Sequence, residues 1–374
     1  MVKRKGNLFN QVCELKNIIE ADKNARKNKK RSKQEIESHD RNILDDNIKL
    51  QELLRTLKYK TSKYIRFKIY EPKERDIFKL PYYPDRITHH AIMNILKPFW
   101  TKQFIENTYS CIEKRGIHRC LKHIKRDLRK TKNTGETQYC LKLDIRKFYP
   151  SIDHLILKSI LERKLKDKRL LKLLFEIIDS TNSVKGCIYG KGVPIGNYLS
   201  QYFANLYLTP FDHWCKEELK CRYYYRYADD IVILHNSKEK LRSILIVIKL
   251  YLNIVLNLRV KNNYQIFPVE SRGIDFVGYV IKHDFIRIRK SIKSRLKNKV
   301  QYYTYGRLKV VLPSYIGWLK YCDSRHLIKK LIHLNKNIIR IMAKRRTGRA
   351  KPMVGKAGVT RSKTAYKCGG KLKK

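Results

Sequence analysis

The chain has 374 residues, of which 43% are hydrophobic, so it can bury a core and form two or three domains. Its 85 Lys and Arg against 33 Asp and Glu give a net charge of +52, which indicates a polyanionic partner such as nucleic acid. The sequence argues against a membrane span, a signal peptide and a Cys-x-x-Cys zinc or redox site, so we expect a cytoplasmic protein without a membrane partner.

The first third of the chain reads as helices around one β-hairpin. Apolar residues recur at helical spacing over 7–21, a basic loop follows from Lys23 to Lys33, and a second amphipathic helix is expected from Asp45 to Leu57. Residues 64–70 alternate as a strand, and the segment that ends at Pro81 returns as its partner. Further helices are predicted from Asp85 onward and over 117–129.

The remainder alternates short strands with helices. The predicted elements, in chain order, are a strand over 139–144, a helix that begins at Ser151, a helix over 170–180, a glycine-rich segment over 186–196, a helix from Tyr198, a hairpin over 222–234, a helix over 238–253, strands with a glycine turn over 271–281, and helices over 291–303, 315–321 and 324–342. From Lys344 the chain is basic and lacks acidic residues, which predicts a disordered tail that could bind RNA.

Two carboxylates stand in the turn of the hairpin. Asp229 and Asp230 lie between an aromatic run and the apolar run Ile231–Leu234, where two negative charges need a cation or a strong hydrogen-bond donor, and a metal ion is the simplest of these. A solvated acidic turn is the alternative for this pair alone. Asp144 also ends an apolar strand, and three carboxylates at one sheet edge would suit two Mg²⁺ ions that act in phosphoryl transfer.

These residues resemble three successive motifs of reverse transcriptases. The motifs are Leu143-Asp-Ile-Arg-Lys-Phe-Tyr149, Gly192-Val-Pro-Ile-Gly196 with Ser200-Gln201, and Tyr227-Ala-Asp-Asp230. Similar motifs cover about 45–340 of the chain. The resemblance implies an α+β right-hand polymerase with fingers, a palm made of an antiparallel sheet with helices, and a helical thumb. It implies an N-terminal helical basic extension (1–60), fingers (61–138), palm (139–285), thumb (286–343) and tail (344–374).

The resemblance also implies roles for individual residues. Asp144, Asp229 and Asp230 would be catalytic and would hold Mg²⁺, with the carbonyl of Ile145 as a further ligand. The dNTP would be bound by the following residues: Arg75, Lys79, Tyr149, Ile195 and Gly196. Tyr149 would exclude a 2′-hydroxyl, and Arg115, Tyr227 and Lys261 would lie against nucleic acid. Lys261 or Tyr264 is the candidate proton donor to pyrophosphate.

Two residues differ from those that most reverse transcriptase families carry, and they indicate one lineage within the family. Ile195 stands where most families carry Gln, and Gln201 stands where they carry Pro, which resembles the reverse transcriptases of diversity-generating retroelements. In that family a template RNA is copied into cDNA with errors at adenines, and the accessory partner is a small basic oligomeric protein. Ile195 is then a fidelity residue, because it cannot hydrogen-bond to the nucleotide or the template. The alternatives are a retron-like or abortive-infection reverse transcriptase, or a non-catalytic RNA-binding scaffold.

Overall fold

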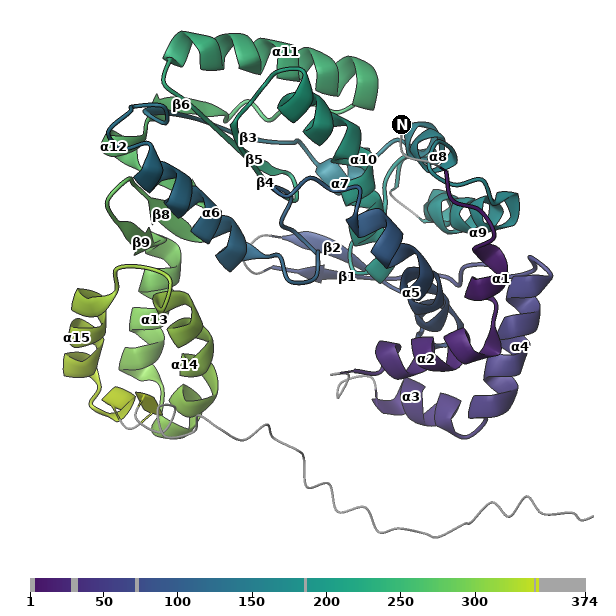
Figure 1. The fold of residues 1–374 in the computed structure, drawn as a ribbon. Helices are drawn as coiled ribbons and strands as arrows, with labels where there is room; N and C mark the ends of the chain where they lie inside the picture. Colours follow the sequence, from purple (N-terminus) through teal and green to yellow (C-terminus); the bar gives the residue numbers. More distant parts are fainter. Residues whose placement is uncertain (1–3, 28–32, 71–73, 185–186, 340, 343–374) are drawn as a thin grey trace, which may run out of the picture. The chain divides into compact units, whose positions relative to one another are not determined.

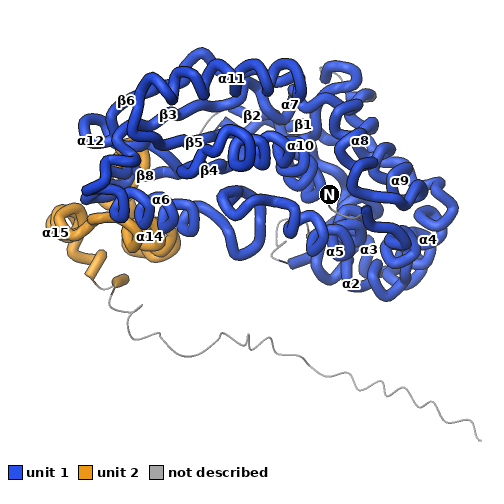
Figure 2. The backbone as a smooth tube through the Cα atoms, turned by 45° about the horizontal axis from the view of Figure 1, so that its top comes forward, with its two compact units in different colours: residues 1–289 blue, residues 290–374 orange. Residues whose placement is uncertain are grey.

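The structure is a computed structural model that describes residues 4–27, 33–70, 74–184, 187–339 and 341–342. The chain divides into two compact units between Arg289 and Lys290 (Figure 2). Strand β9 (Ile286–Ile288) pairs with β8 (Tyr279–Ile281), so residues 286–289 belong to the first unit and not to the helical unit that follows. The tail predicted from residue 344 lies outside the described residues.

The first unit is built around a four-stranded antiparallel sheet in the order β4-β5-β3-β6 (Figure 1). Its strands are β3 (Tyr139–Asp144), β4 (Tyr223–Tyr227), β5 (Asp230–His235) and β6 (Gln265–Pro268). The apolar run of β5 is buried on both faces of the sheet, and helix α11 (Lys238–Leu256) packs along β3, β5 and β6. The α+β class predicted from the sequence is confirmed.

Helices cover the β4 edge of this sheet on both faces. Tyr224 and Arg226 point toward α10 (Tyr198–Glu217), where both donate to Asp212, whereas Tyr225 donates to Asp127 of α6 (Ile117–Lys130). Successive side chains of a strand point to opposite faces, so α6 and α10 lie on opposite sides of β4. The aromatic run that precedes the two aspartates is therefore a core strand.

In its described residues, the N-terminal region forms four helices. The first two pack against α5 (Ile87–Thr101), the fourth packs against the second, and the third packs against the fourth. The four helices are α1 (Phe9–Val12), α2 (Leu15–Ala25), α3 (Lys33–Asp40) and α4 (Ile43–Arg55). The prediction of one helix over 7–21 is wrong, because the chain breaks at Glu14, which is extended with a ψ of 132°. The amide of Asn17 holds this break by donating to the carbonyls of Val12 and Ala91.

The predicted hairpin is confirmed as β1 (Ile65–Ile69) paired with β2 (Arg75–Lys79), and a short turn of π-helix (Tyr82–Arg86) leads into α5. The expected helix start at Ser151 is wrong. A one-turn helix, α7 (Phe148–Ser151), ends there, and α8 (His154–Glu162) begins after Asp153, whose carboxylate accepts the amides of Leu155 and Ile156. Helix α9 (Lys168–Asp179) follows and is capped in the same way by Asp167.

A second sheet closes the first unit. It contains β7 (Ile274–Phe276), β8 and β9, and the predicted glycine turn lies between β7 and β8, where Val277 and Gly278 both have positive φ. Strands β6 and β9 and helix α12 (Val269–Arg272) were not predicted, because three or four residues are too few to show a periodicity.

The described part of the second unit contains α13 (Lys290–Tyr302), α14 (Tyr305–Leu319) and α15 (Arg325–Leu334), and α13 packs against the other two helices. Helix α14 begins ten residues before the predicted segment 315–321 and contains Pro313, a residue type that usually ends helices. Within the described residues, no helix combines the length and the apolar content that crossing a membrane requires.

Candidate active site

The three predicted carboxylates meet at one end of the four-stranded sheet. Asp144 is the last residue of β3 and stands directly opposite Asp230, the first residue of β5. Tyr227 also pairs with Asp230, so Ala228 and Asp229 form a two-residue turn between β4 and β5. Ala228 takes a φ of +56°, the positive value that such tight hairpin turns need and that a residue with a Cβ adopts only under strain.

Burial and mutual repulsion disfavour the charged forms of these carboxylates. Burial first, and then the charges of Asp144 and Asp230, raise the pKa of Asp229 to about 6. Burial and the charge of Asp144 also raise the pKa of Asp230, although nearby cations oppose that rise. The site therefore carries excess negative charge that a bound cation would neutralise.

The donor atoms fit a divalent cation. Oδ1 of Asp144 is buried and has no hydrogen-bond partner in the structure, and Asp229 provides a second carboxylate beside it. In the described residues, no three His, Cys, Asp or Glu side chains are grouped closely enough to hold a metal ion by themselves. Mg²⁺ is commonly held by one or two carboxylates together with substrate phosphates, so Asp144 and Asp229 suffice as protein ligands.

Lys261 is a basic residue that contacts Asp144 directly. Its side chain forms an ion pair with Oδ2 of Asp144, and its backbone amide donates to the carbonyl of Asp144 over 2.8 Å. The adjoining bridge between Ile145 and Val260 fixes this register. By contrast, the ring of Tyr264 lies 3.9 Å from Nζ of Lys249 on α11. Of the two candidate proton donors, Lys261 is therefore the one placed at the carboxylates.

Tyr149 lies close to the carboxylates. Burial raises the pKa of its hydroxyl, the charge of Asp229 contributes to that rise, and the charges of Arg226 and Arg75 oppose it. The carbonyl of Tyr149 accepts the amide of Val193 over 3.0 Å, which ties the residue to the glycine-rich segment before α10. The charges of Asp229 and Arg75, which come from different elements, thus both act on the hydroxyl of Tyr149.

Lys79 was also predicted to bind dNTP, but its ammonium forms an ion pair with Glu35 of α3. Arg115 is also engaged, since its Nη1 donates to the carbonyls of Ile105 and Thr108 over 2.6 and 3.1 Å. Tyr227 stands half-buried at the end of β4, directly before the turn. The nucleotide and nucleic-acid roles of these three residues remain predictions.

The glycine-rich segment packs on the β1–β2 hairpin. The carbonyl of Ile195 accepts the amide of Phe78 over 2.9 Å. Gly196 has a φ of +116°, and a Cβ there would lie 2.9 Å from Cγ2 of Ile77 and 3.3 Å from the carbonyl oxygen of Phe78. In this structure Gly196 is required because its backbone lies close to β2. The approach of Gly196 to a nucleotide remains a prediction.

A buried ion pair beneath the turn was not predicted from the sequence. Arg226 and Asp212 have fully buried side chains, and the guanidinium donates to both carboxylate oxygens over 2.7 and 2.6 Å. Nη1 of Arg226 also donates to the carbonyl of Ala228 over 2.9 Å, so the pair supports the strained residue before Asp229. Two features of the sequence could have indicated this ion pair. They are an arginine inside a buried aromatic strand and an aspartate that follows Phe211 in an apolar helix.

The chain is similar to known proteins over more than half of its length. The family model described as "Reverse transcriptase (RNA-dependent DNA polymerase)" matches residues 72–281, which is more than half of the chain. Protein YkfC of Escherichia coli is 24% identical over 251 residues, and the match covers 57% of this chain and 65% of YkfC. The group II intron-encoded protein LtrA of Lactococcus lactis is 22% identical over 300 residues, with 63% of this chain and 48% of LtrA covered.

The chain thus spans less than two thirds of the length of either relative. Among solved structures, apo telomerase from Candida tropicalis is similar with a TM-score of 0.45 and 12% identity, and the similarity covers 75% of this chain and 64% of the telomerase chain.

Proposed function

Because the chain belongs to the reverse transcriptase family, we propose that it is an RNA-directed DNA polymerase that copies a template RNA into cDNA from dNTPs. The observation that carries this proposal is the convergence of Asp144, Asp229 and Asp230 at one sheet edge in a chain with a net charge of +52. Carboxylates and an excess of cations are what nucleotidyl transfer on a polyanion needs. We expect this activity in the cytoplasm.

In this proposal Asp144 and Asp229 hold two Mg²⁺ ions, with Asp230 and the carbonyl of Ile145 beside them. When bound, the ions would stabilise the attacking and leaving oxygens of the transfer. Lys261 would release its contact with Asp144 and supply a proton to the pyrophosphate. Arg75, whose charge acts on the hydroxyl of Tyr149, would bind the triphosphate of the dNTP, and Lys79 would join it after leaving Glu35.

The proposed biological role is the mutagenic copying of a diversity-generating retroelement, with a small basic oligomeric protein as the partner. Ile195 and Gln201 support this lineage. A retron-like or abortive-infection enzyme is the alternative. A nearby pair of DNA repeats that differ only at adenines would support the first assignment, whereas a structured retron-type RNA gene would support the second.

The polymerase proposal is tested by incubating the protein with a primed RNA template, dNTPs and Mg²⁺. We expect full-length cDNA on the RNA template, and loss of the product when EDTA removes the ions. Tight RNA binding without any cDNA would instead favour the non-catalytic scaffold.

Tyr149 gives a test of sugar selection. Replacing it by Ala should raise the use of rNTPs relative to dNTPs by about 10- to 100-fold, because the bulk that would exclude a 2′-hydroxyl is removed. The ratio of kcat/KM for the two substrates measures this effect. Tyr149→Phe retains the ring and serves as the matched control. If both variants keep the selectivity of the unmodified protein, sugar selection does not reside at Tyr149.

Ile195 gives a test of fidelity. We expect Ile195→Gln to lower misincorporation opposite template adenines, because an amide can hydrogen-bond where an aliphatic chain cannot. The hydrogen bond from Phe78 to Ile195 uses the backbone carbonyl, so the substitution leaves it in place. Sequencing of the cDNA measures the errors, and Ile195→Leu is the control that stays apolar. An unchanged error spectrum in the Gln variant would remove Ile195 from the fidelity mechanism.

A further inference from the structure

An acidic residue of the N-terminal helices contacts a residue that the proposed function assigns to the dNTP. The carboxylate of Glu35 on α3 forms an ion pair with the ammonium of Lys79, the last residue of β2. The two residues are 44 positions apart in sequence, so the contact depends on how the N-terminal helices pack. These helices therefore act directly on a predicted triphosphate-binding residue.

Lys79 lies on the face of β2 that is turned toward the proposed dNTP site. Side chains two residues apart on a strand share a face, so Arg75, Ile77 and Lys79 point the same way. Ile77 lies against Gly196, and the charge of Arg75 acts on the hydroxyl of Tyr149. The strand thus directs Lys79 toward the site, but the ammonium is bound by Glu35.

The second oxygen of the Glu35 carboxylate is also bound. Oε1 accepts Nζ of Lys79, whereas Oε2 accepts the backbone amide of Tyr82 over 3.2 Å. Helix α3 packs on the π-helical turn that contains Tyr82, so the carboxylate is fixed before it meets the lysine. A carboxylate that is already fixed loses less side-chain entropy in the ion pair than one on an open surface does.

Helix α3 is itself held in place by its neighbours. His39 is 2% exposed, and its Nδ1 bonds to Oδ2 of Asp46 on α4 over 2.6 Å. Its ring stacks on Tyr83, with 5.3 Å between the ring centroids. Asp40 accepts Nη1 of Arg26, at the end of α2, over 2.8 Å. The packing of the whole N-terminal region therefore places the carboxylate that binds the end of β2.

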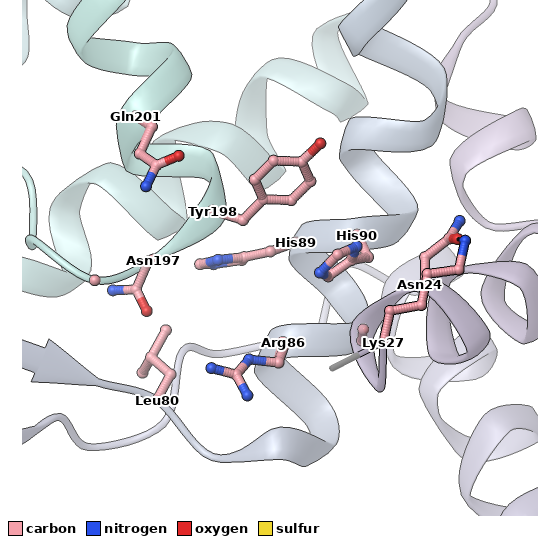
Figure 3. Close-up of a pocket in the computed structure, with 11 residues that line it drawn as sticks. Asn24, Lys27, Leu80, Arg86, His89, His90, Asn197, Tyr198 and Gln201 are labelled. Carbon is pink, nitrogen blue, oxygen red and sulfur yellow. Dashed lines mark hydrogen bonds between the residues drawn. The ribbon is translucent and has the colours of Figure 1, made fainter. Parts of the chain in front are cut away.

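The chain that follows Lys79 offers it no second carboxylate. Leu80 lines a cavity of about 260 Å³, and Figure 3 shows Leu80 near Arg86 and Asn197. None of the residues that line this cavity is Asp or Glu, and Arg86 and Lys27 add positive charge to it. On this side, an anion that competes with Glu35 for Lys79 would have to come from a ligand.

We propose that Glu35 is a positioning residue that holds Lys79 back from the triphosphate and thereby weakens the binding of the incoming dNTP. This inference rests on the proposed function. Binding of a dNTP would exchange the Glu35 carboxylate for the triphosphate, and only protein with a released Lys79 binds with full affinity. The side chains of Lys79 and Glu35 are 33% and 36% exposed, so the pair changes the affinity only a few-fold.

The test measures the binding of a dNTP without its incorporation. The protein is mixed with Mg²⁺ and a primed RNA template whose primer ends in a dideoxynucleotide, and a complementary fluorescent dNTP is titrated. We expect Glu35→Gln to lower the Kd of the dNTP about 3- to 5-fold, because the amide does not hold Lys79 as a carboxylate does. With an extendable primer, KM should fall by the same factor at constant kcat, since the released lysine binds ground state and transition state alike.

A double variant shows whether the effect depends on Lys79. Lys79→Met should raise the Kd, and adding Glu35→Gln to it should cause no further change, because no ammonium remains to be released. Asp40→Asn is the matched control on the same helix. It removes a carboxylate whose ion pair is with Arg26 and not with β2, so it should leave the Kd of the dNTP unchanged.

Three outcomes would overturn the proposal. A higher Kd in Glu35→Gln would mean that Glu35 presents Lys79 to the triphosphate. An equal gain with and without Lys79 would arise from the lost negative charge alone. A lower unfolding temperature of Glu35→Gln with an unchanged Kd would leave the pair a purely structural role. If the expected shift in Kd appears but no cDNA is made, the polymerase proposal alone is rejected, and the absence of dNTP binding in every variant would reject both.

Discussion

Asp229→Asn should abolish cDNA synthesis and, in the absence of metal ions, make the protein more stable. Groups that only orient metal ligands change activity by about 10- to 100-fold when removed, so the loss of a proposed ligand should exceed about 100-fold. The stabilisation follows from the raised pKa of Asp229, which reaches about 6 in the folded state. An ionised Asp229 destabilises the folded state, because its carboxylate is buried and lies beside the charges of Asp144 and Asp230.

The gain in stability of the Asp229→Asn variant depends on pH. An aspartate in an unfolded chain titrates near pH 4, so the folded protein loses stability as Asp229 ionises between about pH 4 and 6. The Asn variant should therefore gain about 1–2 kcal/mol of unfolding free energy at pH 7, and the gain should vanish below about pH 4. Urea titrations with EDTA measure this difference.

Mg²⁺ should reverse the order of stability, because the unmodified protein gains more from binding the ion than the variant does. Asp284→Asn is the control, since it neutralises an exposed carboxylate that is paired with Lys132. It should retain cDNA synthesis and change stability by less than about 1 kcal/mol. Full activity of Asp229→Asn, or lower stability of this variant at pH 7 without metal, would contradict the role assigned to Asp229.

Arg226→Met should destabilise the first unit by about 3–5 kcal/mol, which is the usual effect of leaving one partner of a buried ion pair alone. Asp212 would keep the hydroxyl donors of Tyr224 and Thr108 but would lose both guanidinium bonds. The carbonyl of Ala228 would also lose its donor, so the turn that carries Asp229 would loosen and cDNA synthesis should fall. Urea unfolding and primer extension measure the two effects.

Two further variants test whether the unpaired buried charge causes the loss of stability in Arg226→Met. The double variant Arg226→Met with Asp212→Asn should recover part of the lost stability, because no unpaired charge remains buried and the Asn carbonyl still accepts from Tyr224. Arg222→Met is the matched control on the same side of the hairpin. Its pair with Glu136 is exposed, so its loss should change stability by less than about 1 kcal/mol. Equal effects of Arg222→Met and Arg226→Met would show that burial of the pair is unimportant.

Elements with strong local patterns were predictable. The alternation of residues 64–70, the apolar run after Asp230 and the helical spacing over 117–129 each fixed a strand or helix to within one or two residues. Breaks and short elements were not predictable, because distant contacts decide them. The interruption at Glu14 depends on Asn17, whose amide reaches Ala91, a residue 74 positions away in sequence.

The sequence by itself determined the two hairpins, because each depends on residues that are close together in the chain. The resemblance of its motifs to a known family supplied the α+β class and joined Asp144 to the distant pair Asp229 and Asp230. Only the tertiary structure decided which partners the charged side chains around the site contact. Lys261 reaches Asp144 across 117 positions of sequence, Lys79 is held by Glu35, and Arg226 is neutralised by Asp212 on another element. Long charged side chains have many candidate partners in a chain with 85 cations, and only packing selects among them.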